Sequence, residues 1–275
     1  MNLEFPAVAY GGNIVAGHND YMIIWQTSHA TAGILQGIGR RRVNANGSLL
    51  GYADYVTPPS GPNQGYPDIA YHPSSDEYLA VWAEPYFSTI NIYGGRLNYQ
   101  GTLQGSKFNV YPDMTSEQQA PVVVADHLGG EYLVIWMERF SSYDWEISGV
   151  RRSTSGGLTS TKYWYTMNTV DDKHPAVALN GATGEYMLVW ERYTGSGASI
   201  MSRFWYGPFS EDYQTIEIAP GGFGDNAWPA VAASLSGYFV TYGWRSFVPQ
   251  SDSDIFGRMW LQNRAMPWLQ LLLLD

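Results

Sequence analysis

The hydrophobic positions of this chain recur in blocks of about 54 residues. Each block opens with a proline and a run of small apolar residues, as in Pro175-Ala-Val-Ala-Leu179, and continues to a tyrosine, three mainly apolar residues and an aromatic, as in Tyr186 to Trp190. The opening prolines are Pro6, Pro67, Pro121, Pro175 and Pro229, so the last three intervals are 54 residues each (67 to 121, 121 to 175 and 175 to 229). Self-similarity at such a period indicates a repeat architecture.

Two further segments complete each block. The first carries an isoleucine shortly before an arginine: Ile92 to Arg96, Ile147 to Arg151, Ile200 to Arg203 and Ile255 to Arg258. Glycine-containing turns of the hairpin type follow, such as Asn44 to Gly47, and a last apolar run closes the block. Each block therefore predicts four short strands, although the fifth block is imperfect at its second strand.

The run from Tyr132 to Trp136 is apolar throughout instead of alternating, which is typical of a strand covered on both faces. A ring of four-stranded meanders covers every sheet in this way and leaves fewer edges than a solenoid. The sequence thus predicts an all-β fold: a five-bladed β-propeller with four antiparallel strands per blade. We expect one domain over 1–275, with the run from Leu269 to Leu274 as the last strand and blades at about 5–60, 61–115, 116–169, 170–223 and 224–275.

Charge and composition exclude several partners and cofactors. There are 25 acidic and 15 basic residues, a formal net charge of −10, which disfavours nucleic acid. The only long apolar run is too short to span a bilayer, so no membrane insertion is expected. There is no cysteine, the five histidines lack metal-ligand spacing and no phosphate-binding loop is present, so we predict no cofactor and no metal. The absence of cysteine suits a secreted or cell-surface protein, although Met1 to Phe5 is no signal peptide.

The repeat resembles a widespread bacterial propeller repeat of the form Pro-x-Val-Ala-Tyr, then Tyr-Leu-Val-Val-Trp, then Ile-Tyr-Gly-x-Arg. The resemblance covers residues 5–274 and implies the propeller fold, but the repeat has no assigned function. Five-bladed propellers as a class are similar to two functional groups. One comprises the tachylectin-type sugar-binding lectins, and the other the arabinanase, xylosidase and fructosidase glycoside hydrolases.

A binding site is expected in the loops where first strands begin and second strands end. These loops hold many aromatic residues and carboxylates, which suit a glycan or protein ligand: Tyr66, Tyr86, Phe87, Tyr143, Trp145, Tyr193, Phe223, Trp228, Trp244, Phe247, Glu84, Glu138, Asp144, Glu191 and Asp225. The residue before the repeat proline differs in every block, which argues against a shared structural role. We therefore predict Trp228, Tyr66, Asp225, Asn226 and Glu191 as ligand-binding residues.

The main hypothesis is a non-enzymatic recognition propeller, and two alternatives stay open. A glycoside hydrolase would draw its carboxylates from Asp68, Glu84, Glu138 and Glu191. Asp68 stands where the other blocks have Ala or Val, but Ala7 occupies the first-block position where the hydrolases would carry aspartate. Glu84, Glu138 and Glu191 are alternatively partners of nearby arginines: Arg139, Arg192 and Arg245. The third hypothesis is an architectural module of a larger surface protein. No catalytic residue is assigned.

Overall fold

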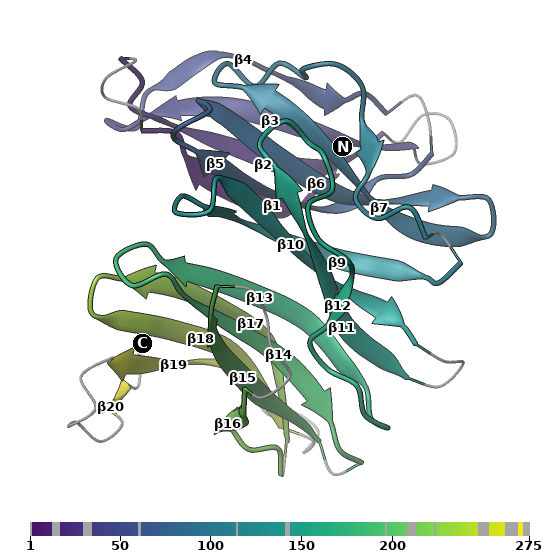
Figure 1. Cartoon of the computed structure of the whole chain (residues 1–275), viewed down its shortest axis with the longest axis vertical. Coiled ribbons are helices and arrows are strands. Elements are labelled where there is room, and N and C mark those ends of the chain that lie inside the picture. The colour runs from purple at the N-terminus through teal and green to yellow at the C-terminus, as the bar shows by residue number, and fades with distance from the viewer. Residues whose placement is uncertain are drawn as a thin grey trace. The chain divides into compact units, whose positions relative to one another are not determined.

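The computed structural model describes residues 2–12, 17–29, 35–59, 62–113, 115–140, 144–195, 197–207, 213–222, 224–246, 253–261 and 269–271. These residues form five antiparallel sheets of four strands each, the blades of a five-bladed β-propeller (Figure 1). The predicted fold class is therefore confirmed. None of the described residues belongs to a helix long and apolar enough to cross a membrane.

Every blade is one continuous stretch of chain whose strands lie side by side in chain order. Blade 1 consists of β1 (Asn2–Tyr10), β2 (Asp20–His29), β3 (Leu35–Asn44) and β4 (Leu49–Thr57). Blade 2 consists of β5 (Gly65–His72), β6 (Glu77–Tyr86), β7 (Thr89–Asn98) and β8 (Phe108–Asn109). Blade 3 consists of β9 (Gln118–Asp126), β10 (Glu131–Arg139), β11 (Trp145–Ser153) and β12 (Tyr163–Trp164).

Blade 4 consists of β13 (Asp172–Asn180), β14 (Glu185–Tyr193), β15 (Ala198–Tyr206) and β16 (Thr215–Ala219). Blade 5 consists of β17 (Gly224–Ser234), β18 (Gly237–Ser246), β19 (Ser253–Leu261) and β20 (Leu269–Leu271). The C-terminal run does supply the last strand, because β20 pairs with β19 through Met259, Arg258 and Gly257. We expect Leu269, Leu271 and Leu273 to alternate in burial with Gln270, Leu272 and Leu274, but these side chains lie outside what the structure describes.

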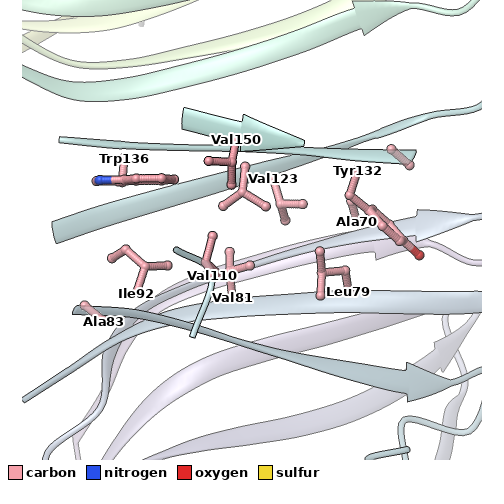
Figure 2. Close-up of a cluster of buried hydrophobic side chains, with 12 residues drawn as sticks. Ala70, Leu79, Val81, Ala83, Ile92, Val110, Val123, Tyr132, Trp136 and Val150 are labelled. Carbon is pink, nitrogen blue, oxygen red and sulfur yellow. The ribbon is translucent and has the colours of Figure 1, made fainter. Parts of the chain in front are cut away.

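The described chain divides into two compact units, 1–138 with 149–162 and 139–148 with 163–275. In the first unit, Trp82 of blade 2 packs with Met22 and Ile24 of blade 1. Trp136 and Val123 of blade 3 lie opposite blade 2 residues such as Val81, Leu79 and Ile92 (Figure 2). In the second unit a further core joins blades 4 and 5: Ala178, Met187, Val189, Ile200, Ile218, Ala219, Tyr238, Val240 and Tyr242.

The tryptophans predicted to lie in the core, Trp82, Trp136 and Trp190, are all 0% exposed. Their strands β6, β10 and β14 are buried on both faces over five or more consecutive residues. Second strands of the first and last blades differ, because their burial alternates: Met22 and Ile24 are fully buried in β2 while Tyr21 is exposed.

A β-bulge interrupts the first strand of every blade at the repeat proline. The pairing with the second strand shifts there, between Gly65 and Asp68 in blade 2 and between Ala227 and Ala230 in blade 5. The residue before the proline has positive φ in all five blades: Phe5 (49°), Tyr66 (51°), Ala120 (47°), His174 (48°) and Trp228 (52°). The five positions therefore share a backbone role, contrary to the argument from their differing side chains.

Candidate functional site

A recurrent polar pair, three and four residues before the repeat proline, links adjacent blades. One member accepts a hydrogen bond from a backbone N–H near the start of the preceding blade's third strand: Asn63 from Gln36 (3.3 Å), Asp171 from Trp145 (3.0 Å) and Asp225 from Ala198 (3.0 Å). The other member is buried in every case: Gln64, Gln118, Asp172 and Asn226. The sequence signal for this pair is its fixed spacing from the proline, which the search for ligand residues passed over.

Two of the predicted ligand-binding residues belong to this pair. Asp225 accepts the Ala198 N–H through Oδ1. Asn226 is 4% exposed and donates through Nδ2 to the carbonyl oxygens of Ala198 (3.1 Å) and Pro220 (2.9 Å). Their polar atoms are therefore used between blades 4 and 5, and whether they also contact a ligand stays a prediction.

Trp228 and Glu191, two others of the predicted set, lie together. The Trp228 ring is 60% exposed and its centroid lies 4.0 Å from that of His174. The backbone N–H of Trp228 donates to Glu191 Oε1, and the Tyr193 hydroxyl donates to Glu191 Oε2 at 3.0 Å. His174 Nδ1 lies 2.9 Å from the same Oε2. The result is an exposed indole above a fully buried carboxylate that three neighbours contact.

The local electrostatics reflect this burial. Burial first, and then the nearby Glu191 carboxylate, raise the pKa of Tyr193. Lys173 lies beside this tyrosine, with Nζ 5.1 Å from the ring centroid and 2.5 Å from Asp171 Oδ2. Tyr193 is therefore a neutral hydrogen-bond donor to Glu191 at ordinary pH, and the charge of Lys173 is balanced by Asp171.

Tyr66, the remaining predicted residue, belongs to the first unit and makes the corresponding arrangement there. Its ring centroid lies 4.5 Å from that of Phe5, and its N–H donates to Gln26 Oε1 at 3.3 Å. Gln26 is 6% exposed and follows Trp25, just as Glu191 follows Trp190. Sequence reasoning missed Gln26, although its position directly after the second-strand tryptophan was available as a signal.

Glu84 and Glu138 occupy equivalent buried positions and are neutralised by lysines. Trp136 Nε1 donates to Glu138 Oε2 at 3.0 Å, and Lys162 Nζ lies 2.8 Å from Glu138 Oε1. Glu84 likewise accepts from Trp82 Nε1 (3.1 Å) and pairs with Lys107. The alternative interpretation of these glutamates expected arginines as their ion-pair partners. The structure instead pairs both with lysines that lie just before the fourth strand.

The arginines and Glu191 have other partners. Arg192 forms a two-bonded pair with Asp172, at 2.8 and 2.7 Å, and Arg139 lies over the Trp145 ring at 5.8 Å. Arg245 is exposed. Glu191 contacts His174 instead of an arginine. The second-strand exits of blades 2, 3 and 4 thus hold carboxylates of two kinds, two fixed by lysine and one beside histidine.

Asp68 is a half-buried carboxyl on the first strand of blade 2. Its Oδ2 accepts the N–H of Val123 on β9 at 2.7 Å. Burial raises the pKa of Asp68 from 3.8 to about 6, against the opposing effect of hydrogen bonds from the N–H groups of Val123 and Ile69. A carboxyl with this pKa exchanges protons close to neutral pH, as a general acid or base must.

A second carboxyl with a raised pKa is buried between blades 3 and 4 in the second unit. Burial raises the pKa of Glu146 to about 7. Its Oε2 lies 3.3 Å from Asn168 Nδ2, which also donates to Asp172 Oδ2 at 2.7 Å. Glu146 is 0% exposed, so this network serves the fold. Sequence reasoning did not single it out, because nothing in its spacing distinguishes it from a loop residue.

Other loop aromatics are scattered. Phe87 is 92% exposed and meets Tyr86 edge to face at 4.6 Å, while Trp244 packs against Phe256. Tyr143, Phe223 and Phe247 lie outside the described residues. Among the residues that are described, no group of three or more histidine and acidic side chains is placed to hold a metal ion.

No protein-family model matches the chain, and no curated protein matches its sequence. Solved structures do resemble its fold. A thermostable family-43 glycoside hydrolase is 12% identical with a TM-score of 0.60, and the match covers 94% of this chain and 90% of that one. An α-L-arabinofuranosidase from Lactobacillus brevis is 10% identical with a TM-score of 0.58, over 94% and 91% of the two chains. A GH43 β-1,3-galactosidase is 8% identical with a TM-score of 0.59, over 98% and 94%.

At these identities the likeness establishes the five-bladed fold alone. It nevertheless corrects the main functional hypothesis. The three structures named above are glycoside hydrolases, and this finding contradicts the main hypothesis of a non-enzymatic recognition propeller in favour of its hydrolase alternative. The error came from the weight given to Ala7 in the first block, which was set above the aspartate, Asp68, at the equivalent position of the next block.

Proposed function

We propose that this chain is a glycoside hydrolase of the five-bladed propeller type. The observation that carries the proposal is Asp68, a half-buried carboxyl whose pKa is raised to about 6 on the first strand of a blade. The proposal is supported by the match, over nine-tenths of both chains, to hydrolases described as acting on arabinofuranosides and β-1,3-galactosides. Terminal arabinofuranosyl and galactosyl units are accordingly the substrates proposed for this chain.

The chemistry needs a carboxyl group that donates a proton to the leaving oxygen, and a second that activates water or attacks the sugar. Asp68 takes the first role, because a carboxyl of pKa about 6 is partly protonated near neutral pH. The Val123 N–H holds Oδ2 and so fixes the position of the Asp68 carboxyl group. Glu4, exposed on the neighbouring β1, is proposed as the second carboxyl.

The test is hydrolysis of aryl α-L-arabinofuranosides, aryl β-D-galactosides and β-1,3-galactooligosaccharides. Wild-type protein should release product with a bell-shaped pH profile that has one limb near pH 6. Asp68→Asn should lower kcat by at least about 100-fold, since it removes a proton donor but keeps an acceptor for the Val123 N–H. Asp54→Asn, an exposed carboxylate paired with Arg40, is the matched control and should be unchanged.

Absence of turnover on all three substrates by folded wild-type protein would contradict the proposal. So would full activity of Asp68→Asn. Glu4→Gln tests the second carboxyl. If this variant loses activity and its pH profile keeps only the limb near pH 6, Glu4 is the second carboxyl. If its activity is unchanged, Glu4 does not have that role, and the role of Asp68 is unaffected.

A further inference from the structure

Two equivalent scaffolds in different blades support an aromatic residue before the proline. In blades 1 and 2, the neutral amide of Gln26 accepts the Tyr66 N–H. In blades 4 and 5, the carboxylate of Glu191 accepts the Trp228 N–H from the same strand position. A neutral acceptor therefore satisfies this backbone donor, and the fold does not require a charge there. The charge of Glu191 is what distinguishes the second scaffold.

His174 occupies the space between this charge and the exposed ring. It is itself the residue before the proline of blade 4, with φ of 48°. Its Nδ1 lies 2.9 Å from Glu191 Oε2, and its side chain is 21% exposed. The Glu191 carboxylate lies beside Nδ1 without making a hydrogen bond to it, and the contact with an external hydroxyl is placed at the other ring nitrogen, Nε2.

Trp228 is the most exposed of the five residues before the repeat prolines, although all five share its positive φ. The indole is 60% exposed, although burying a side chain of this size is worth several kcal/mol as an order of magnitude. Its φ of 52° is a conformation that a bulky residue before proline seldom adopts. A large exposed ring beside a buried carboxylate and a partly exposed histidine offers an apolar face and polar partners together, as ligand sites do.

We infer that Trp228, His174 and Glu191 form a sugar-binding subsite, with the C–H face of a sugar ring stacked on the indole and a sugar hydroxyl bound to His174 Nε2. This inference rests on the proposed hydrolase function for its ligand class, a sugar, and it concerns residues of the second unit alone. Lys173, the cation next to His174 in the chain, is paired with Asp171. The subsite therefore suits a neutral ring with one apolar face better than an anionic ligand.

Binding is measured in the Asp68→Asn protein, so that no ligand is consumed, by calorimetric titration with galactose, arabinose and β-1,3-galactobiose. Trp228→Ala should weaken binding at least about tenfold, because the stacking surface is lost. Glu191→Gln should fold as wild type, because Gln26 accepts the equivalent backbone N–H in blade 1. It should weaken sugar binding about threefold or more, because the carboxylate beside His174 is lost. Tyr52→Ala, which removes a 95% exposed ring on β4, is the matched control and should bind normally.

Unchanged sugar affinity in Trp228→Ala would overturn the subsite, as would the absence of binding by any of the three sugars. If Trp228→Ala fails to fold, Trp228→Phe, with a smaller stacking surface, should still show a measurable loss of affinity. The outcomes separate the two proposals. Sugar binding that depends on Trp228, without turnover, would support the subsite and contradict the hydrolase proposal. Turnover with an unaltered KM in Trp228→Ala would support the hydrolase proposal and contradict the subsite.

Discussion

At the scale of single residues, the position before each repeat proline is defined by its backbone and not by its side chain. Five residue types adopt φ between 47° and 52° there, although this region is costly for anything but glycine. The bulge lets the chain pass the proline, which has no N–H to donate to the second strand. The side chain is left free to vary, which is why three aromatics and a histidine occur there.

Ala120 tests this account, since it has no aromatic partner to preserve. Ala120→Gly should leave the free energy of unfolding unchanged or raise it by up to about 1 kcal/mol, because glycine tolerates positive φ. Ala120→Val should lower it by about 1–2 kcal/mol, because a β-branched residue is least tolerant of this conformation. Chemical denaturation of the two variants decides; a valine variant more stable than the glycine variant would contradict the account.

Asp68 makes a second residue-scale prediction, about pH. Its pKa is about 6 in the folded protein against 3.8 for the free group, so the folded state binds the proton more tightly. Stability due to this difference is present below about pH 4 and is lost as the pH rises through 6, by up to about 3 kcal/mol. Asp68→Asn should therefore raise the melting temperature at pH 7.5 and give no gain at pH 4.

A structural carboxylate would behave in the opposite way, with its replacement destabilising the protein at neutral pH. Thermal denaturation of both proteins at the two pH values distinguishes these cases. A gain in stability together with a loss of turnover is the behaviour expected of a residue retained for function.

At the scale of strands, the sequence predicted most of what local periodicity controls. The unbroken apolar run of β10 indicated a strand covered on both faces, and all three tryptophans of this type are fully buried. The partners of Glu84 and Glu138 were missed because the search looked at adjacent residues such as Arg139. Successive side chains of a strand point to opposite faces, so the residue next to a glutamate in the chain is a poor guide to its partner; Lys162, which pairs with Glu138, comes from the segment just before the fourth strand.

The buried Glu138–Lys162 pair gives a prediction at this scale. Glu138→Ala should lower the free energy of unfolding by about 3–5 kcal/mol, because a buried ammonium and the Trp136 N–H lose their carboxylate. The double variant Glu138→Leu, Lys162→Met should lose much less than the sum of its single changes. Asp54→Ala, which breaks the exposed pair with Arg40, should change stability by at most about 1 kcal/mol. Additive losses in the cycle would mean that the two side chains are not coupled.

At the scale of the whole chain, the repeat predicted five four-stranded blades, which the structure confirms, and a site in the loops where first strands begin and second strands end, which stays a prediction. The polar pair that precedes four of the five repeat prolines links blades. Asp225 and Asn226 belong to this structural series, and their spacing from the proline is enough to identify them as members. The two proposals instead rest on departures from such series, namely Asp68 and Glu191. A departure has a visible chemical meaning only when its surroundings are known: burial for Asp68, and the His174 contact for Glu191.

Completion of the last blade by the C-terminus is the final prediction, and it concerns the state of the whole molecule. β20 covers the edge of β19 through three paired residues, Gly257 with Leu271, Arg258 with Gln270 and Met259 with Leu269. Ile255 and Met259 on β19 are already 66% and 40% exposed, so removing β20 would leave an unpaired apolar edge. A chain ending at residue 267 should therefore form concentration-dependent oligomers in sedimentation velocity and melt at a lower temperature, whereas a chain ending at Leu271 keeps every paired residue and should sediment and melt as the full chain does. A monomeric chain ending at 267, with the melting temperature of the full chain, would show that β20 does not protect this edge.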